Sequence, residues 1–229
     1  MSPACAHCYA DTLARRYGHQ LWDTSRSRRF FTEAHWRKPL KWNRDAQQDG
    51  TSVKVFCASM ADVFEEHPDL NPWRRRLWTL IEETPALQWQ LLTKRPEAVA
   101  AMVPWGQDWP ANVWIGASIE NSRFTFRADI LRELPAKVRF ISAEPLLGSL
   151  FLNGKLNRRP LDLAGIDWLI AGGESGPRHR PVEVSWVREL RRACRDTGTA
   201  FFFKQHGGRT AKAGGRLLDG RVYGEFPTV

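Results

Sequence analysis

Short apolar runs recur along this chain, and each of them ends in polar residues. Residues 138–141 are apolar and β-prone, Ser142 and Glu144 follow, and Pro145 prevents the strand from continuing. The pattern occurs at six places, namely residues 53–58, 89–92, 113–117, 138–141, 168–171 and 200–203. Runs of this length and composition are typical of buried strands. The sequence therefore predicts six buried strands, each with polar side chains at its carboxyl end.

Helical patterns separate the predicted strands. Residues 72–83 and 96–102 are predicted helices, and each begins with a proline in its first turn. Asn121 is expected to cap the helix that follows it, and Ser185 is expected to cap the last helix of the chain. Strands that alternate with helices of this length imply right-handed parallel crossovers.

The predicted fold is α/β, a partial TIM-type β/α barrel of about six parallel strands in one domain over residues 1–229. Residues 19–50 are basic, aromatic and irregular, and they are interpreted as an insertion. Residues 207–229 form a tail rich in glycine and basic residues, which either folds over the barrel or extends from it. Because β/α barrels gather their functional groups at the carboxyl ends of the strands, this rim is the predicted functional centre.

Three glutamates stand at predicted strand ends: Glu120, Glu144 and Glu174. Carboxylates on a shared rim can act as acid and base, hold a metal, or bind an amine or a ribose hydroxyl. Each can instead pair with a neighbouring Lys or Arg. The Gly-Gly-Glu-Ser-Gly segment at residues 172–176 either forms a tight turn or offers backbone N–H groups to a ligand. The other candidate polar residues at predicted strand ends are Ser59, Asp62, Lys94, Arg95, Ser118, Lys204 and Gln205.

The chain of 229 residues has a formal charge of +9 and a pI near 9.8. This charge favours an anionic partner, either nucleic acid or a phosphorylated substrate, although a solvated basic surface explains it equally well. Eleven tryptophans are present, and several flank basic residues. Aromatic and basic side chains together can stack on bases and hold phosphates, although packing on a helix face explains Trp73 and Trp78 equally well. No apolar run is long enough to cross a membrane and no signal-peptide hydrophobic region is present, so a cytoplasmic location without a membrane partner is expected.

The cysteines are not spaced like a secreted disulfide framework. Cys5 and Cys8 form a C-x-x-C pair, which indicates metal binding or redox chemistry. Two thiols do not complete a four-ligand zinc site, so other ligands such as His7 or Cys57 would be required. Cys57 and Cys194 lie in apolar segments and are interpreted as core residues.

Seven ordered motifs extend over nearly the whole chain, at residues 3–10, 59–62, 91–96, 114–120, 139–147, 172–176 and 201–205. Together they resemble the phage gp-thirty-seven/gp-sixty-eight domain family. Members of that family carry three cysteines and resemble radical S-adenosylmethionine (SAM) enzymes. In such enzymes three thiolates hold a 4Fe-4S cluster whose fourth iron binds SAM.

The resemblance implies a radical-SAM-like barrel in which Cys5 and Cys8 are cluster ligands, matching the second and third cysteines of the motif. The first cysteine and the first barrel strand have no counterpart here. We therefore expect that Met1 is a misassigned start and that the native protein extends further upstream. The expected activity is radical chemistry, dependent on the cluster and SAM, on a substrate that is nucleic-acid-related or phosphorylated.

The resemblance also divides the strand-end residues by role. The candidates for binding SAM are Ser59, Asp62, Ser118 and Glu120. The candidates for binding substrate are Lys94, Arg95 and Gln205. The candidates for catalysis are Glu144, Glu174 and Lys204. Two other functions remain open: a cluster-free hydrolase or lyase that uses Glu120 and Glu144 as a carboxylate pair, and a non-catalytic nucleic-acid-binding barrel.

Overall fold

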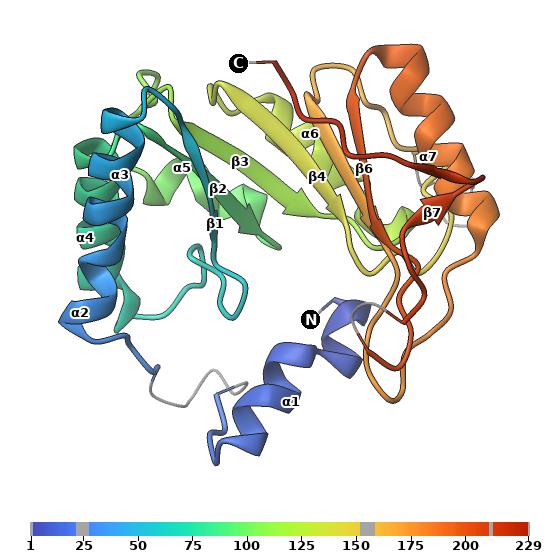
Figure 1. The fold of residues 1–229 in the computed structure, drawn as a ribbon, viewed down its shortest axis with the longest axis horizontal. Coiled ribbons are helices and arrows are strands. Elements are labelled where there is room, and N and C mark those ends of the chain that lie inside the picture. Colours follow the sequence, from blue (N-terminus) through green and yellow to red (C-terminus); the bar gives the residue numbers. More distant parts are fainter. Residues whose placement is uncertain (1, 22–27, 152–158, 211–212, 229) are drawn as a thin grey trace. The chain divides into compact units, whose positions relative to one another are not determined.

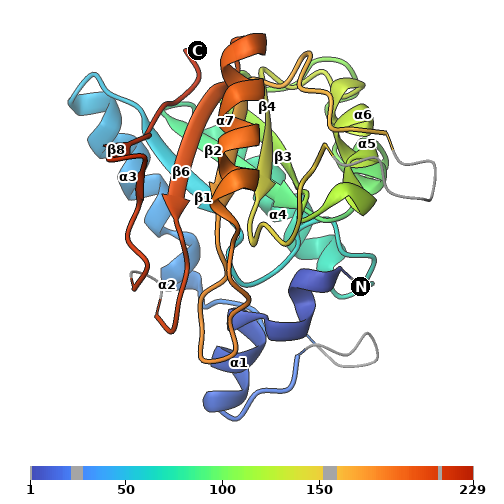
Figure 2. The same ribbon diagram turned by 90° about the vertical axis from the view of Figure 1, so that its right-hand side faces the viewer.

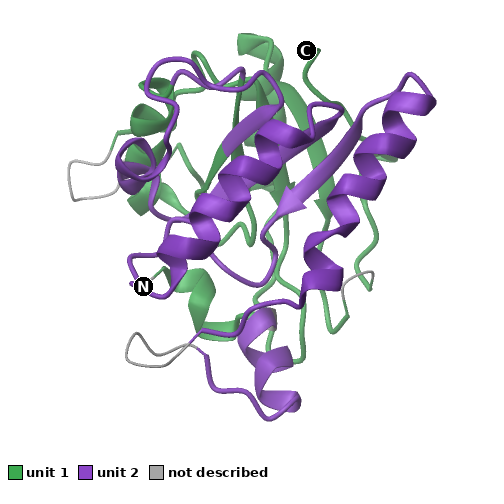
Figure 3. Cartoon of the chain, turned by 90° about the vertical axis from the view of Figure 1, so that its left-hand side faces the viewer, with its two compact units in different colours: residues 1–9, 116–134, 138–229 green, residues 10–115, 135–137 purple. Residues whose placement is uncertain are grey.

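The computed structural model describes residues 2–21, 28–151, 159–210 and 213–228 (Figures 1 and 2). The chain divides into two compact units (Figure 3). Unit 1 comprises Met1–Tyr9, Gly116–Leu134 and Val138–Val229. Unit 2 comprises Ala10–Ile115 and Pro135–Lys137. The expectation of a single domain stays a prediction.

Unit 2 is built on two parallel strands, β1 (Val53–Cys57) and β2 (Leu87–Thr93), with Val53 opposite Leu87. Its helices are α1 (Tyr9–Arg16, which starts in unit 1), α2 (Glu33–Trp36), α3 (Lys38–Gln48), α4 (Leu70–Glu83) and α5 (Val99–Met102), with the 3₁₀ turn η2 (Pro96–Ala98). Helix α4 buries Leu77, Trp78 and Ile81 on one face. The helical spacing of these apolar residues turns that face toward the core. Helices α3 and α4 lie side by side (Figure 1).

Unit 1 contains three parallel strands, β4 (Val138–Ala143), β5 (Trp168–Gly172) and β6 (Ala200–Gln205). Its helices are α6 (Phe126–Arg132) and α7 (Val184–Thr197), with the 3₁₀ turns η1 (Pro3–His7) and η3 (Ser122–Phe124). Helix α7 packs against β5 and β6 (Figure 2). It buries Val187, Leu190 and Cys194, which are spaced to share one helical face.

Strand β3 (Val113–Ser118) runs from unit 2 into unit 1, and the strand order is β1-β2-β3-β4-β5-β6, which is the order along the chain. Parallel strands in sequential order with helical crossovers confirm the predicted α/β fold of a partial TIM-type β/α barrel. Every residue of β3 and of β5 is buried, as expected for strands covered on both faces. Gly116 is required in β3, because a Cβ there would lie 2.4 Å from the ring of Phe140.

The prediction that all six strands are buried is wrong for β1. Val53 is 40% exposed and Phe56 is 44% exposed. In the described strand order β1 stands at the end, with β2 as its single neighbour. An apolar run therefore does not distinguish an edge strand from a central one, because the number of neighbours is a tertiary property.

The two predicted helix caps differ in outcome. Asn121 is a cap as predicted, since its side chain accepts a hydrogen bond from the N–H of Arg123 and starts η3. Ser185 is not a cap, because the backbone is already helical at Val184 and Glu183 occupies the cap position without a side-chain hydrogen bond. The hydroxyl of Ser185 therefore lies inside the first turn.

The described part of the C-terminal tail folds along the sheet. Strands β7 (Leu217–Leu218) and β8 (Arg221–Val222) form a hairpin. The chain then pairs with β6, where the N–H of Phe203 donates to the carbonyl of Tyr223 at 3.0 Å. Residues 211–212 and 229 of the tail, and residues 22–27 of the predicted insertion, lie outside the described residues. Among the described helices none combines the length and apolarity needed to cross a bilayer.

Candidate functional site

The segment that carries Cys5 and Cys8 is attached to two strand ends of unit 1. The hydroxyl of Ser2 donates a hydrogen bond to the carboxylate of Glu120, which follows β3. His7 Nδ1 lies 3.4 Å from Oε2 of Glu174, which follows β5. Both thiols are half-buried and neither forms a disulfide. The C-x-x-C pair therefore lies beside the carboxyl ends of β3 and β5, as a barrel-rim site requires.

Glu174 is enclosed by an arginine that the sequence did not reveal. Its carboxylate accepts hydrogen bonds from Arg180 Nη2 at 2.6 Å, Nε at 2.9 Å and the backbone N–H at 2.8 Å. Arg180 Nη2 also donates to the carbonyl of Pro3 at 3.1 Å. Burial raises the pKa of Glu174, but the hydrogen bonds and charge of Arg180, with a contribution from His7, lower that pKa below its ordinary value. Glu174 is therefore ionised, and its geometry suits positioning the cysteine segment.

Glu120 is fully buried beside a second arginine. Its Oε2 lies 3.5 Å from Arg127 Nη1, and the same nitrogen donates to the carbonyl of Ser118 at 2.5 Å. The guanidinium of Arg127 lies over the ring of Phe124, at 4.4 Å from its centroid. Ser118 is buried as well. A buried carboxylate that binds Ser2 and lies beside Arg127 holds the N-terminal segment at the end of β3, which disfavours the alternative in which Glu120 is half of a hydrolytic carboxylate pair.

Glu144 and Lys204 form the accessible strand-end pair of unit 1. Lys204 Nζ lies 2.9 Å from Glu144 Oε2, with side-chain exposures of 57% and 19%. The Ser142 hydroxyl lies 3.4 Å from the other carboxylate oxygen. The Glu144 carboxylate lies over Gly172, where a Cβ would come within 3.1 Å of Oε2. A cation and an anion thus face solvent at the ends of β4 and β6.

The glycine-rich segment at residues 172–176 serves chain packing in this structure. The N–H of Gly173 donates to the carbonyl of Gln205 at 2.9 Å, and that of Gly176 to the carbonyl of Gly208 at 2.9 Å. A Cβ on Gly173 would lie 2.0 Å from the carbonyl oxygen of His206. These N–H groups therefore donate hydrogen bonds to the adjacent segment of the same polypeptide, at residues 205–208. Gln205 Nε2 donates to the hydroxyl of Ser175 at 2.8 Å, which orders the end of β6.

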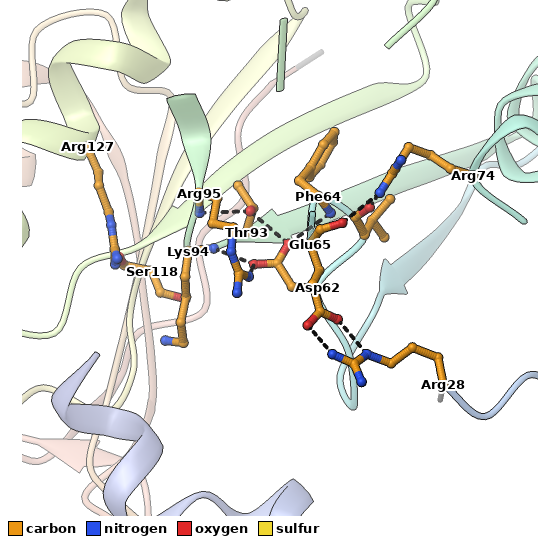
Figure 4. Close-up of polar contacts among 11 residues, drawn as sticks. Arg28, Asp62, Phe64, Glu65, Arg74, Thr93, Lys94, Arg95, Ser118 and Arg127 are labelled. Carbon is orange, nitrogen blue, oxygen red and sulfur yellow. Dashed lines mark hydrogen bonds and ion pairs between the residues drawn. The ribbon is translucent and has the colours of Figure 1, made fainter. Parts of the chain in front are cut away.

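Asp62 organises the strand ends of unit 2 (Figure 4). Its Oδ1 accepts from Thr93 Oγ1 at 2.8 Å and from the N–H of Phe64 at 3.0 Å. Its Oδ2 accepts from the N–H of Lys94 at 3.0 Å and from Arg95 Nη1 at 2.9 Å. Asp62 therefore joins the loop after β1 to the end of β2, where it holds the backbone of Lys94 and the guanidinium of Arg95. Ser59 is exposed on the same loop.

Two further arginines stabilise that loop. Arg28 donates to Glu65 at 2.6 Å and 3.0 Å, and Arg74 donates to the carbonyls of Val63 and Glu65 at 2.9 Å and 2.8 Å. Burial lowers the pKa of Arg74, which the charge of Asp62 partly offsets. Arg28 and Arg74 were absent from the sequence prediction, because loop partners far apart in the chain leave no periodic signal. The convergence of the unit 1 and unit 2 residues on one rim stays a prediction.

The described residues contain no group of three His, Cys, Asp or Glu side chains arranged to hold a metal ion. His7 lies against Glu174. Burial raises the pKa of the Cys57 thiol to about 12, and burial together with the charge of Glu225 raises that of Cys194 to about 12. Both are therefore neutral thiols at pH 7, which disfavours them as ligands. The interpretation of Cys194 as a core residue is confirmed by its burial, whereas Cys57 is half-buried.

Comparisons with known proteins identify the family. The family described as "Protein of unknown function (DUF5131)" matches residues 1–227, and the chain belongs to this family. No curated protein matches the chain, and no solved structure matches it.

Proposed function

Starting from its membership in this family, we propose that the chain is a radical-SAM-type β/α-barrel protein in which Cys5 and Cys8 bind irons of a 4Fe-4S cluster. One observation carries the proposal. The C-x-x-C segment is attached to Glu120 and Glu174, at the carboxyl ends of two parallel strands. Strand ends of this kind hold the reacting groups in β/α barrels.

The donor set fits such a cluster in two of its ligand positions. Thiolates are the ligands of iron–sulfur clusters, and a SAM-binding cluster needs three of them. Cys5 and Cys8 supply two, and the described residues bring no third donor to them. The described residues therefore do not complete the cluster by themselves, and a third thiolate from another source is required. A bound cluster would supply the electron for cleavage of SAM.

The protein's own residues have separable tasks in this proposal. Glu174 and Arg180 fix the backbone of the cysteine segment, because Arg180 bridges the Glu174 carboxylate and the carbonyl of Pro3. Glu144 and Lys204 are accessible, so they are the unit 1 groups suited to contact substrate and to exchange a proton with it. Lys94 and Arg95 are held at the end of β2 as candidates for binding an anionic substrate group.

The test is reductive cleavage of SAM. The purified chain is incubated without oxygen with iron, sulfide and an excess of a small thiol, then given SAM and dithionite, and 5′-deoxyadenosine is measured. We expect deoxyadenosine from the wild type and none from Cys5→Ser or Cys8→Ser. Ala6→Ser changes the exposed residue between the two cysteines and is the matched control, expected to retain the activity. An iron-loaded protein that leaves SAM intact contradicts the proposal.

A further inference from the structure

A second surface, in unit 2, combines aromatic rings with basic side chains. We call it the aromatic patch, and its rings are those of Phe30, Phe31, His35, Trp36 and Trp73. They come from the loop before α2, from α2 itself and from the start of α4. None of these residues takes part in the strand-end sites described above. The patch therefore needs its own explanation.

The inner rings of the aromatic patch form a fixed stack. Phe30 and Trp73 are parallel within 14° at a centroid separation of 4.6 Å, and Trp36 stacks on Trp73 at 5.7 Å. The guanidinium of Arg76 lies 4.7 Å from the Trp36 ring centroid, and Glu33 holds it through two contacts of 2.6 Å. The ring stack and the Arg76–Glu33 contacts join α2 to α4.

The outer rings form a similar stack, but they face solvent. Phe31 and His35 stack at 3.9 Å with their planes within 15° of each other, and Phe31 is 62% exposed. Core packing does not explain an exposed, parallel pair of rings. Such a pair presents flat π-faces of the kind on which a nucleobase stacks.

The charges around the aromatic patch have one dominant sign. Residues 28–48 contain six Lys or Arg and two Asp or Glu. Glu33 pairs with Arg76, and Asp45 pairs with Lys41. Within the described parts of the chain, the exposed Lys38 and Arg75 form no ion pair, and Arg37 acts on the charge of Glu33 without a salt bridge to it. These cations are available to phosphate groups, whereas the local carboxylates are already neutralised.

From this geometry we infer that the aromatic patch binds single-stranded nucleic acid. Bases stack on Phe31 and His35, and Arg37 and Lys38 contact the adjacent phosphates. Base stacking requires exposed base faces, so a duplex, whose faces are covered, binds more weakly. The inference does not depend on the cluster proposed above, because the patch contains neither Cys5 nor Cys8.

The experiment measures binding of a fluorescent thymidine oligonucleotide by anisotropy, with the same sequence as a duplex for comparison. We expect Phe31→Ala/His35→Ala to weaken binding about tenfold. We expect Arg37→Ala/Lys38→Ala to make the negative slope of log K against log salt shallower by about 1.4, because two phosphate contacts are lost. Phe126→Ala and Arg192→Ala remove an exposed ring and an exposed cation of unit 1 and are the matched controls, expected to bind normally.

Two further variants separate the possible causes of a change. Phe31→Trp keeps a stacking face and is expected to retain binding, which would show that an aromatic ring at position 31 is what binding requires. Cys5→Ser/Cys8→Ser is expected to bind the oligonucleotide normally even if the cluster proposal is wrong. Duplex binding as tight as single-strand binding would overturn the inference. Unchanged binding by Phe31→Ala/His35→Ala would overturn it as well.

Discussion

Glu144 and Glu174 are the same residue type at the carboxyl ends of neighbouring parallel strands, and their surroundings differ. Glu174 is 5% exposed, and Arg180 and His7 contact its two oxygens. Glu144 is 19% exposed and faces the solvent-exposed ammonium of Lys204. A carboxylate enclosed by an arginine is part of the framework, whereas one beside an exposed lysine remains accessible to a ligand. The residues that surround a strand-end carboxylate therefore decide the role of that carboxylate.

The same distinction applies to the other strand-end carboxylates. Asp62 accepts hydrogen bonds from four groups within the described part of unit 2, and Glu120 is fully buried beside Arg127. Both resemble Glu174 in having their oxygens engaged by the protein. We expect large effects on stability from the enclosed carboxylates and their partners, and a small effect from the accessible pair.

The largest expected effect is that of Arg180→Ala. Removal of the guanidinium leaves the Glu174 carboxylate buried without its main partner, so the free energy of unfolding should fall by about 3 kcal/mol. Urea unfolding measures this loss. Arg178→Ala, at an exposed neighbouring position, is the control and should change stability by less than about 0.5 kcal/mol. Equal stabilities of the two variants would show that the Arg180–Glu174 contact is dispensable.

A somewhat smaller effect is expected in unit 2. Asp62→Ala removes an acceptor from the Thr93 hydroxyl, the Lys94 N–H and Arg95, and should lower the free energy of unfolding by about 2 kcal/mol. Amide hydrogen exchange should show the loss of protection at the Lys94 N–H. Glu66→Ala, on the exposed part of the same loop, is the control. Protection that is unchanged in Asp62→Ala would argue against this role.

The pH dependence of stability tests the surroundings assigned to Glu174. The folded-state pKa of Glu174 is lowered from 4.5, so its contribution is complete above pH 4.5 and is lost as the pH falls through the folded-state pKa. The stability difference between the wild type and Glu174→Gln should therefore shrink toward acid pH. Urea unfolding at a series of pH values measures it. A difference that grows as the pH falls has the opposite sign and would contradict the assignment.

The smallest effect is expected at the accessible pair. Lys204 is more than half exposed, so Lys204→Met should change the free energy of unfolding by less than about 1 kcal/mol. Thermal unfolding of the variant checks this. A loss as large as that in Arg180→Ala would place Lys204 and Glu144 in the framework and remove the contrast between the two glutamates.

The sequence predicted the strands well because local apolar composition determines them. The runs at residues 138–141 and 168–171 are β4 and β5, extended by at most two residues. The exposure of β1 was not predictable, since a strand's neighbours are set by the tertiary fold. Ser185 failed as a cap because the helix begins one residue before it.

The positions of the strand-end residues were predictable, and their pairings were not. The position of Glu174 after a strand identified it, but Arg180 follows in a loop without periodicity, so the sequence gives no indication that this arginine encloses the carboxylate. The attachment of Ser2 and His7 to strand ends more than 100 residues away is likewise a long-range contact. The role of a carboxylate depends on such contacts more than on its position in a motif.

The most direct test of the central claim is the iron bound per chain after reconstitution without oxygen, measured together with the Mössbauer spectrum. If Cys5 and Cys8 are the ligands beside the strand ends, the wild type and Ala6→Ser should bind cluster iron and Cys5→Ser/Cys8→Ser should bind none. Equal iron and identical spectra in all three proteins would contradict the account.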